Sequence, residues 1–161
     1  MAANTSAQFA DQKRRFVFTR DFDAPRALVF ELWTTERHLT RWFCPQGFVI
    51  TDCEVAFRTG GGFHVGMRSP DGEDFRWQAR YRDIAAPERI VFSHGLVDEN
   101  DAPCFDVLTT VQFDEREGGT RITVEAAVQA IYDPASMMNL DCMEQGWTEA
   151  LDKLAAYAAE A

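Results

Sequence analysis

Three side chains in the sequence could transfer protons inside a cavity: His94, Tyr81 and Glu144. His94 shares its strand parity with Ile90 and Phe92, so its ring is expected to face inward. Imidazole changes its protonation near neutral pH, and in a cavity it could donate a hydrogen bond or carry a proton. The alternative is a strand-end histidine that is satisfied by a neighbouring backbone carbonyl. The first interpretation predicts ligand chemistry, and the second predicts a structural role.

Two charged residues also fall on positions that are expected to face inward. Arg20 has the parity of Phe18 and Phe22 in a strand-like segment. Glu144 lies on the apolar stripe of the last helical segment. Because a buried charge without a partner is strongly unfavourable, the two could pair with each other or with other groups. Alternatively, they could anchor the carbonyl or carboxylate of a ligand within an apolar pocket.

The sequence lacks the motifs of metal, nucleotide or triad chemistry. The three histidines, at 38, 64 and 94, are too widely spaced to be grouped as metal ligands. The glycines at 60–62 precede a strand and lack the Lys-Ser or Lys-Thr of a phosphate loop, so we interpret them as turn or bulge glycines. The four cysteines form no C-x-x-C pair, which favours reduced structural thiols. We therefore expect no metal and no cofactor.

The segments that carry these residues follow an α+β pattern. Period-two alternation predicts a strand at 15–22, and two short helices follow it and end at Cys44-Pro45, where proline stops the helical hydrogen bonds. From Phe48 onward the pattern fits five or six antiparallel strands, with hairpin turns at Ser69-Pro70-Asp71-Gly72 and Glu117-Gly118-Gly119. Residues 1–13 are polar and aperiodic. We expect a flexible tail there and a single domain at 14–161.

A long helix is predicted at the end of the chain. After a turn at Asp133-Pro134, about 25 residues have spacings of three and four that align one helix face. That face carries Met137, Leu140, Glu144, Trp147, Leu151, Leu154 and Ala158. Gly146 lies within the helix, where glycine costs about 1 kcal/mol relative to alanine. Since a helix made only for packing rarely combines a glycine with a carboxylate on its apolar side, we expect this helix to roof a cavity.

The composition limits the partners. The chain has 26 acidic and 16 basic residues and a net charge of -10, which argues against binding the phosphate backbone of nucleic acids. No apolar run approaches the roughly 18 residues of a membrane span. The N-terminus also lacks the apolar region of a secretory signal, so a cytoplasmic protein is expected. If the chain self-associates, a homodimer is the commonest arrangement.

Several short motifs follow one another along the chain, each occurring once: Arg20-Asp21-Phe22-Asp23-Ala24-Pro25, Arg41-Trp42-Phe43-Cys44-Pro45, Gly60-Gly61-Gly62-Phe63, Pro70-Asp71-Gly72, Pro87-Glu88-Arg89-Ile90-Val91-Phe92, Gly119-Thr120 and Gly146-Trp147. In this order the chain resembles stand-alone bacterial members of the helix-grip (START/SRPBCC) superfamily. Within it, the chain is most similar to proteins related to the C-terminal domain of the activator of heat-shock-protein-90 ATPase. The resemblance covers roughly residues 14–158. Thr59 stands where that family commonly has a proline before its glycines.

The resemblance implies a helix-grip fold: a curved antiparallel sheet of about six or seven strands, wrapped around the C-terminal helix, with two short helices after the first strand. It also implies that a small hydrophobic or amphipathic molecule binds between sheet and helix. An enzymatic alternative, a cyclase, dehydratase or hydrolase, would use the same cavity. Chaperone ATPase regulation is suggested by the family name alone, and we favour a ligand-binding protein that is not an enzyme.

The pattern of sidedness fits either a filled core or a lined cavity. A ligand cavity of this kind is mostly apolar and carries a few polar anchors. The residues expected to line it are Arg20, Trp33, Trp42, Phe63, Met67, Trp77, Tyr81, Phe92, His94, Phe105, Thr109, Met138, Glu144 and Trp147.

Overall fold

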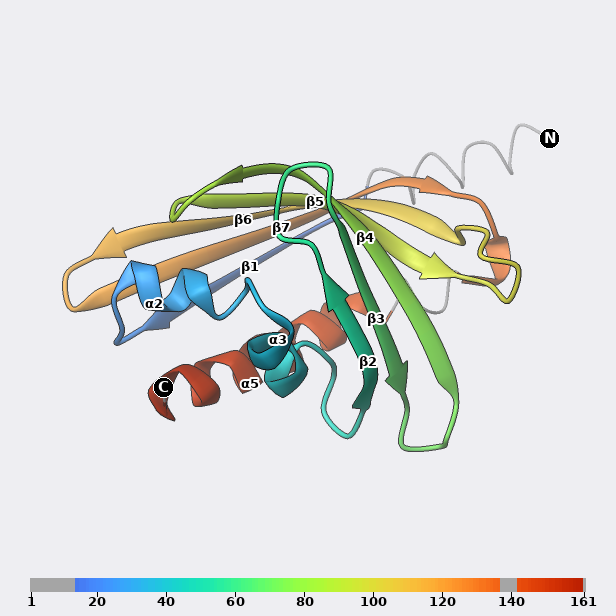
Figure 1. Cartoon of the computed structure of the whole chain (residues 1–161), viewed down its shortest axis with the longest axis horizontal. Coiled ribbons are helices and arrows are strands. Elements are labelled where there is room, and N and C mark those ends of the chain that lie inside the picture. The colour runs from blue at the N-terminus through green and yellow to red at the C-terminus, as the bar shows by residue number, and fades with distance from the viewer. Residues whose placement is uncertain (1–13, 137–141, 161) are drawn as a thin grey trace.

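A computed structural model describes residues 14–136 and 142–160, which form one curved antiparallel sheet with helices on a single face (Figure 1). The elements are β1 (Arg15–Phe22), α2 (Arg26–Glu31), α3 (Glu36–Trp42), β2 (Val49–Val55), β3 (Gly62–Arg68), β4 (Asp74–Ala85), β5 (Arg89–Val97), β6 (Phe105–Arg116), β7 (Gly119–Ile131), a 3-10 turn (Pro134–Ser136) and α5 (Met143–Glu160). The strand order is β1-β7-β6-β5-β4-β3-β2. The predicted α+β helix-grip fold is therefore confirmed, with seven strands.

Period-two alternation determines which face of each strand is buried. On β4, the inward residues Trp77, Ala79 and Tyr81 are buried, while Arg76 and Arg80 are exposed on the outer face. Such alternation is expected of a sheet with one face on the core and the other in solvent. The aromatic face of β4 therefore points toward α5, as the sequence predicts.

The predicted hairpins also form where expected. Ser69-Pro70-Asp71-Gly72 connects β3 to β4, and Gly72 has a φ of 86°. The turn between β6 and β7 contains Gly118, with a φ of 84°. Glycine adopts this left-handed backbone without the steric cost that a Cβ brings.

Breaks in the strand register bend the sheet around the last helix. The pairing shifts between Ile50 and Asp52, between Tyr81 and Asp83, and between Asp106 and Val107. Such irregularities increase local bending and twist. In Figure 1, β2, β3 and β4 consequently turn away from β1, β6 and β7, and α5 crosses the concave side between the two groups.

The last helix is shorter than the sequence pattern suggests. The described helix runs from Met143, not from the Asp133-Pro134 turn, and Pro134–Ser136 form only a 3-10 turn. Met137 and Leu140 lie outside the described residues, so their place on the predicted stripe stays a prediction. Leu151 and Leu154 are fully buried, which confirms the stripe over the second half of the helix.

A filled aromatic core occupies the end of the sheet that α2 and α3 cover. The Trp33 ring lies at its centre, with ring centroids 4.6 Å from Trp42, 6.0 Å from Phe113 and 6.4 Å from Trp147. Trp33 and Trp42 are almost completely buried. This half of the interior is packed, so space for a ligand has to be sought near the beginning of α5.

Candidate functional site

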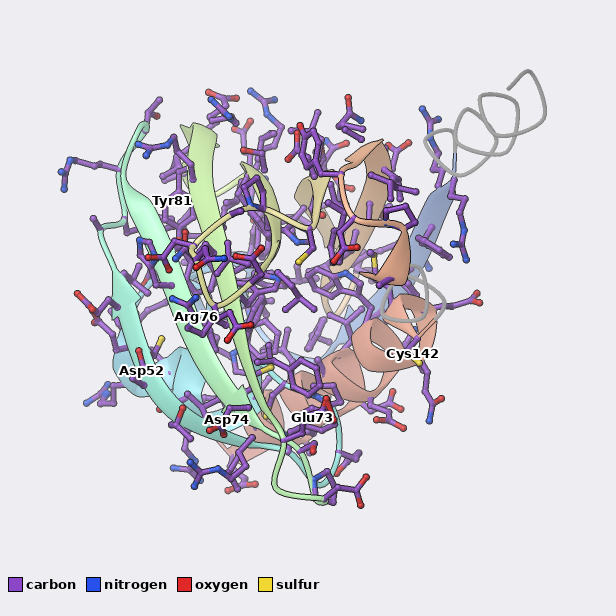
Figure 2. The ribbon with its side chains drawn as sticks, turned by 90° about the vertical axis from the view of Figure 1, so that its right-hand side faces the viewer. Asp52, Glu73, Asp74, Arg76, Tyr81 and Cys142 are labelled. Atoms are coloured by element: carbon purple, nitrogen blue, oxygen red, sulfur yellow. The ribbon has the colours of Figure 1, made fainter. Side chains whose placement is uncertain are left out.

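An apolar cleft of about 190 Å³ lies between the beginning of α5 and the inner face of strands β3 to β6. Figure 2 views this end of the molecule, with Cys142 labelled just before α5. The residues that line the cleft are Phe43, Cys44, Pro45, Phe48, Met67, Phe75, Trp77, His94, Leu96, Phe105, Cys142, Met143, Gly146, Trp147 and Ala150. We call this the α5 cleft. The interior therefore combines a filled core at one end with a cleft at the other.

Small residues on the helix leave room for the α5 cleft. Gly146 and Ala150 lie one helical turn apart and both line it. A Cβ on Gly146 would meet only Pro45 Cγ, at 3.6 Å, which is an ordinary van der Waals contact. The glycine is thus not required by close packing. Its main effect is to leave the wall of the cleft without a side chain.

On the sheet side, the space arises where β5 and β6 stop pairing. Their ladder ends at His94 opposite Val107, and beside it the pairing of β6 with β7 shifts between Asp106 and Val107, which leaves Gln129 of β7 unpaired in the ladder. Beyond that point the backbones of Gly95 and Phe105 lie so close that a Cβ on Gly95 would be 2.0 Å from the carbonyl oxygen of Phe105. Phe105, at the beginning of β6, is one of the residues that line the cleft.

A chain of hydrogen bonds fixes the imidazole of His94 in the floor of the cleft. Trp77 Nε1 donates to His94 Nδ1 over 3.1 Å, and His94 Nε2 lies 2.7 Å from Thr109 Oγ1. An indole nitrogen can only donate, so Nδ1 must accept and carries no proton. The neutral ring therefore holds its proton on Nε2 and donates it to Thr109.

The same contacts keep His94 neutral. Burial lowers the pKa of His94 to about 3, because the charged imidazolium loses its hydration in this apolar site. A second proton, on Nδ1, would also remove the acceptor of the Trp77 N–H and leave two donors facing each other. His94 thus has side-chain partners, not the backbone carbonyl that the sequence suggested as the alternative, and both of its nitrogens are occupied.

A second polar contact lies at the edge of the α5 cleft. Lys153 Nζ donates to the Cys44 carbonyl oxygen and lies 3.2 Å from Cys44 Sγ. The Cys44 thiol in turn points to the carbonyl oxygen of Phe48, at 3.5 Å. These bonds tie the loop after α3 to the last helix. Cys44 lines the cleft, whereas Lys153 is not among the lining residues.

The predicted cavity residues fall into four groups. Those that line the α5 cleft are Met67, Trp77, His94, Phe105 and Trp147. Those that lie within the packed interior, away from the cleft lining, are Trp33, Trp42, Phe63, Tyr81, Phe92 and Thr109. Arg20 and Glu144 lie away from the cleft lining, and Met138 is outside the described residues.

The inward placement predicted for Glu144 is wrong. Glu144 is exposed, and Met143 lines the cleft instead. At 100° per residue, Glu144 lies about 60° from Trp147, at the margin of the buried stripe. It also falls in the first turn of α5, where free backbone N–H groups favour a solvated carboxylate. A carboxylate anchor at this position is not part of the cleft.

Arg20 is an ion-pairing residue on the surface. Its strand parity is inward, and its half-buried side chain reaches the exposed Asp152 on α5, with Nη2 3.3 Å from Oδ1. The long aliphatic stem lets the charge reach water from a half-buried position. The structural ion pair considered in the sequence exists, but the partner of Arg20 is Asp152 and not Glu144.

Sequence reasoning missed about two thirds of the lining. Phe43 is the most informative omission, because its ring packs 5.0 Å from Trp77 and 5.9 Å from Trp147. It follows Trp42 directly, and only the αR-to-loop transition at the end of α3 decides which of the two aromatic rings reaches the cleft. Proximity to Pro45 was the available signal, since a proline ends the helix and redirects the chain.

Comparison with protein families settles what kind of chain this is. Residues 23–159 match the model of the family described as activator of Hsp90 ATPase homolog 1-like protein. The chain belongs to this family. No curated protein matches it in sequence.

Solved structures of several other proteins have the same fold. A protein from Arthrobacter aurescens shares 28% identity over 93% of this chain and 88% of its own, with a TM-score of 0.78. One from Rhizobium leguminosarum shares 26% identity over 92% and 95%, with a TM-score of 0.76. The AHSA1 protein from Silicibacter pomeroyi is similar in fold, at 20% identity over 91% and 98% and a TM-score of 0.75.

Two further observations concern the described part of the chain. It contains no group of three or more His, Cys, Asp or Glu side chains that could hold a metal ion. It also contains no helix long and apolar enough to cross a membrane. The expected homodimer and cytoplasmic location stay predictions.

Proposed function

We propose that this AHSA1-like protein binds one small, uncharged and largely aromatic molecule in the α5 cleft. The observation that carries the proposal is the composition of the lining. In the described residues the cleft has no charged side chain, and its imidazole is neutral with both nitrogens bonded. A ligand there meets aromatic rings, thioethers and thiols.

The chemistry of the lining argues against a charged ligand. Moving a carboxylate or ammonium from water into an apolar site without a counter-charge costs several kcal/mol. Trp77, Phe43 and Trp147 offer ring faces and edges, and Met67 and Met143 are flexible thioethers that pack well against aromatic rings. These contacts favour a neutral aromatic compound over the amphipathic acids that are also compatible with the fold.

The volume sets the size of the ligand. Apolar cavities of about 150 Å³ hold benzene, so the 190 Å³ cleft suits one or two fused rings, or about ten heavy atoms. At roughly 0.5 kcal/mol per heavy atom, such a ligand gains about 5 kcal/mol, which corresponds to a dissociation constant of a few hundred micromolar. Binding assays therefore need millimolar ligand.

Binding is favoured over the enzymatic alternative because the candidate proton carriers do not meet at the cleft. Both nitrogens of His94 are occupied, and Glu144 is exposed away from the lining. Burial raises the pKa of Tyr81, whose hydroxyl lies outside the cleft lining. Chaperone regulation still rests on the family name alone.

The proposal is tested with a matched pair of ligands, indole and indole-3-carboxylate. Methyl NMR of Met67 and Met143 reports on occupancy, because both side chains line the cleft. We expect saturable methyl shifts with indole and at least tenfold weaker binding of the carboxylate. Equal binding of the two, or no shift at 5 mM indole, would refute the proposal.

A filled cleft provides the matched variant. Gly146→Leu places a side chain in the cleft and is expected to abolish indole binding. Ala156→Leu, on the exposed side of the same helix, is the control and should bind like the wild type. Loss of binding in both variants would locate the indole elsewhere.

A further inference from the structure

A second groove lies on the opposite face of the sheet, and its lining is polar. It has a volume of about 410 Å³ and runs across the outer side of strands β3 to β6. Nine polar side chains are among the residues that line it: His64, Gln78, Arg80, Arg82, Ser93, His94, Asp101, Asp106 and Tyr132. We call this the outer groove.

Two arginines in the outer groove differ from most arginines of the sheet. Arg68, Arg89 and Arg121 each pair with a carboxylate, on Asp74, Asp83 and Asp21 respectively. By contrast, Arg80 Nη1 donates to the carbonyl oxygen of Gly60 over 2.8 Å, and Arg82 Nε donates to Ser93 Oγ over 2.9 Å. Neither has a carboxylate in salt-bridge contact within the described residues.

Each guanidinium keeps most of its donors free. An arginine carries five N–H donors and no acceptor, and Arg80 and Arg82 each spend one nitrogen on a neutral oxygen. Although the register shift on β4 falls at Arg82, both side chains line the outer groove, and Ser93 both pairs with Arg80 and accepts from Arg82. In a chain of net charge -10, two guanidiniums therefore lie side by side at the β4 part of the groove, although Asp101 and Asp106 also belong to its lining.

Neighbouring strands leave the space beside these cations open. The residues opposite Arg80 are Gly62 on β3 and Ser93 on β5. A Cβ on Gly62 would lie 2.8 Å from His64 Nε2, so the imidazole of His64 folds over this glycine toward the row that contains Arg80. Arg80 is therefore flanked by the His64 imidazole on the β3 side and by the Ser93 hydroxyl on the β5 side.

The carboxylates that border the outer groove leave its β3 side free. Asp101, in the loop that precedes β6, accepts a hydrogen bond from Arg76 and forms an ion pair with it. Arg76 is labelled in Figure 2. Asp106 lies on β6, and β5 and β4 separate it from His64 on β3. Burial raises the pKa of Asp106, and the nearby charge of Arg82 opposes that effect. Within the lining the carboxylates therefore lie on the β6 side and the donors around Arg80, while exposed Glu54, opposite His64 on β2, lies beyond the lining at the β3 edge.

We propose that Arg80, Arg82 and His64 form a binding site for the oxyanion of a small metabolite, a phosphate or a carboxylate. Guanidinium forks match the geometry of both groups and bind them with charge-assisted hydrogen bonds. None of these three residues lines the α5 cleft, although the outer groove shares His94, Leu96 and Phe105 with it where β5 and β6 stop pairing. Failure of this proposal would leave the proposed aromatic ligand untouched.

The experiment is an NMR titration that observes the arginine side chains directly. The Nε–Hε signals of the protein are followed at pH 7 and constant ionic strength while inorganic phosphate is added, and acetate is added in a parallel arm. We expect saturable shifts at Arg80 and Arg82 with at least one anion. Saturation by phosphate alone assigns phosphate esters, and saturation by acetate alone assigns carboxylates.

Matched variants complete the test. Arg80→Gln should weaken binding at least tenfold, and Arg82→Gln should weaken it less, because Asp106 already draws on that charge. Arg121→Gln removes an exposed, ion-paired arginine of the same sheet and should leave affinity unchanged. Non-saturating shifts of equal size at all arginines, or equal affinity in Arg80→Gln and Arg121→Gln, would overturn the proposal.

Discussion

Acid should destabilise this protein through His94, and the size of the effect follows from its surroundings. His94 is buried, and its pKa falls from an ordinary value of 6.5 to about 3 in the folded chain. Between these values the unfolded chain binds a proton that the folded chain does not. Stability is therefore fully present above pH 6.5 and is lost as the pH falls toward 3.

The loss of unfolding free energy grows with each pH unit below the unfolded pKa of His94. Each pH unit below the unfolded pKa costs about 1.4 kcal/mol, so going from pH 7.5 to pH 5 should remove about 2 kcal/mol of unfolding free energy through this residue alone. Other groups also titrate, so the wild type must be compared with a variant that lacks the imidazole.

The variant is His94→Gln, whose amide can accept from Trp77 and donate to Thr109 without titrating. Imperfect geometry should cost it about 1–2 kcal/mol at pH 7.5. In urea unfolding at pH 7.5, 6 and 5, the stability difference between the two proteins should then shrink and approach zero at pH 5.

Two results would refute this reasoning. The wild-type and variant curves could stay parallel across the pH range, which would mean that the folded and unfolded chains protonate residue 94 alike. Alternatively, nitrogen NMR of the imidazole could show a midpoint near pH 6, or a proton on Nδ1. Either result would also remove the argument that the floor of the α5 cleft is neutral.

Three further changes have clear expected outcomes. Gly146→Ala should stabilise the protein by about 0.5–1 kcal/mol in urea unfolding, because a Cβ fits there; destabilisation would show that the site is tighter than its contacts indicate. In thiol labelling, the exposed Cys142 should react before the buried Cys44, and millimolar indole should slow Cys44; labelling of Cys44 that indole does not change would place the ligand elsewhere. Arg20→Gln should cost less than about 1 kcal/mol and leave indole affinity unchanged, since Arg20 forms a surface pair with Asp152; a tenfold loss of affinity would restore Arg20 as a ligand anchor.

The fold was predictable because its signals are local. The alternation of Trp77, Ala79 and Tyr81 with arginines requires only that one face of β4 be buried. The turns at Gly72 and Gly118 require only a residue that accepts positive φ. Neither signal depends on the neighbouring element, and the structure contains both the buried face of β4 and the two glycine turns.

The cleft was harder to predict because its residues are chosen by contacts between distant segments. Met143 rather than Glu144 faces inward because the helix begins at Met143, which periodicity alone does not fix. The Cys44 and Lys153 contact joins residues 109 positions apart. Trp77, His94 and Thr109 lie on three adjacent strands, and their hydrogen bonds depend on the register of the sheet.

A neutral lining has a consequence for selectivity in the α5 cleft. A site that hydrogen-bonds its ligand rejects an analogue without that group strongly, because buried partners are left unpaired. Here Trp77 Nε1 and both nitrogens of His94 already satisfy one another or Thr109, so a ligand neither gains nor breaks these bonds. Discrimination is left to shape, and one methylene is worth only about 1–3 kcal/mol. Since flexible methionines form part of the wall, the cleft should select by size and charge and accept a series of related aromatic compounds with similar affinity.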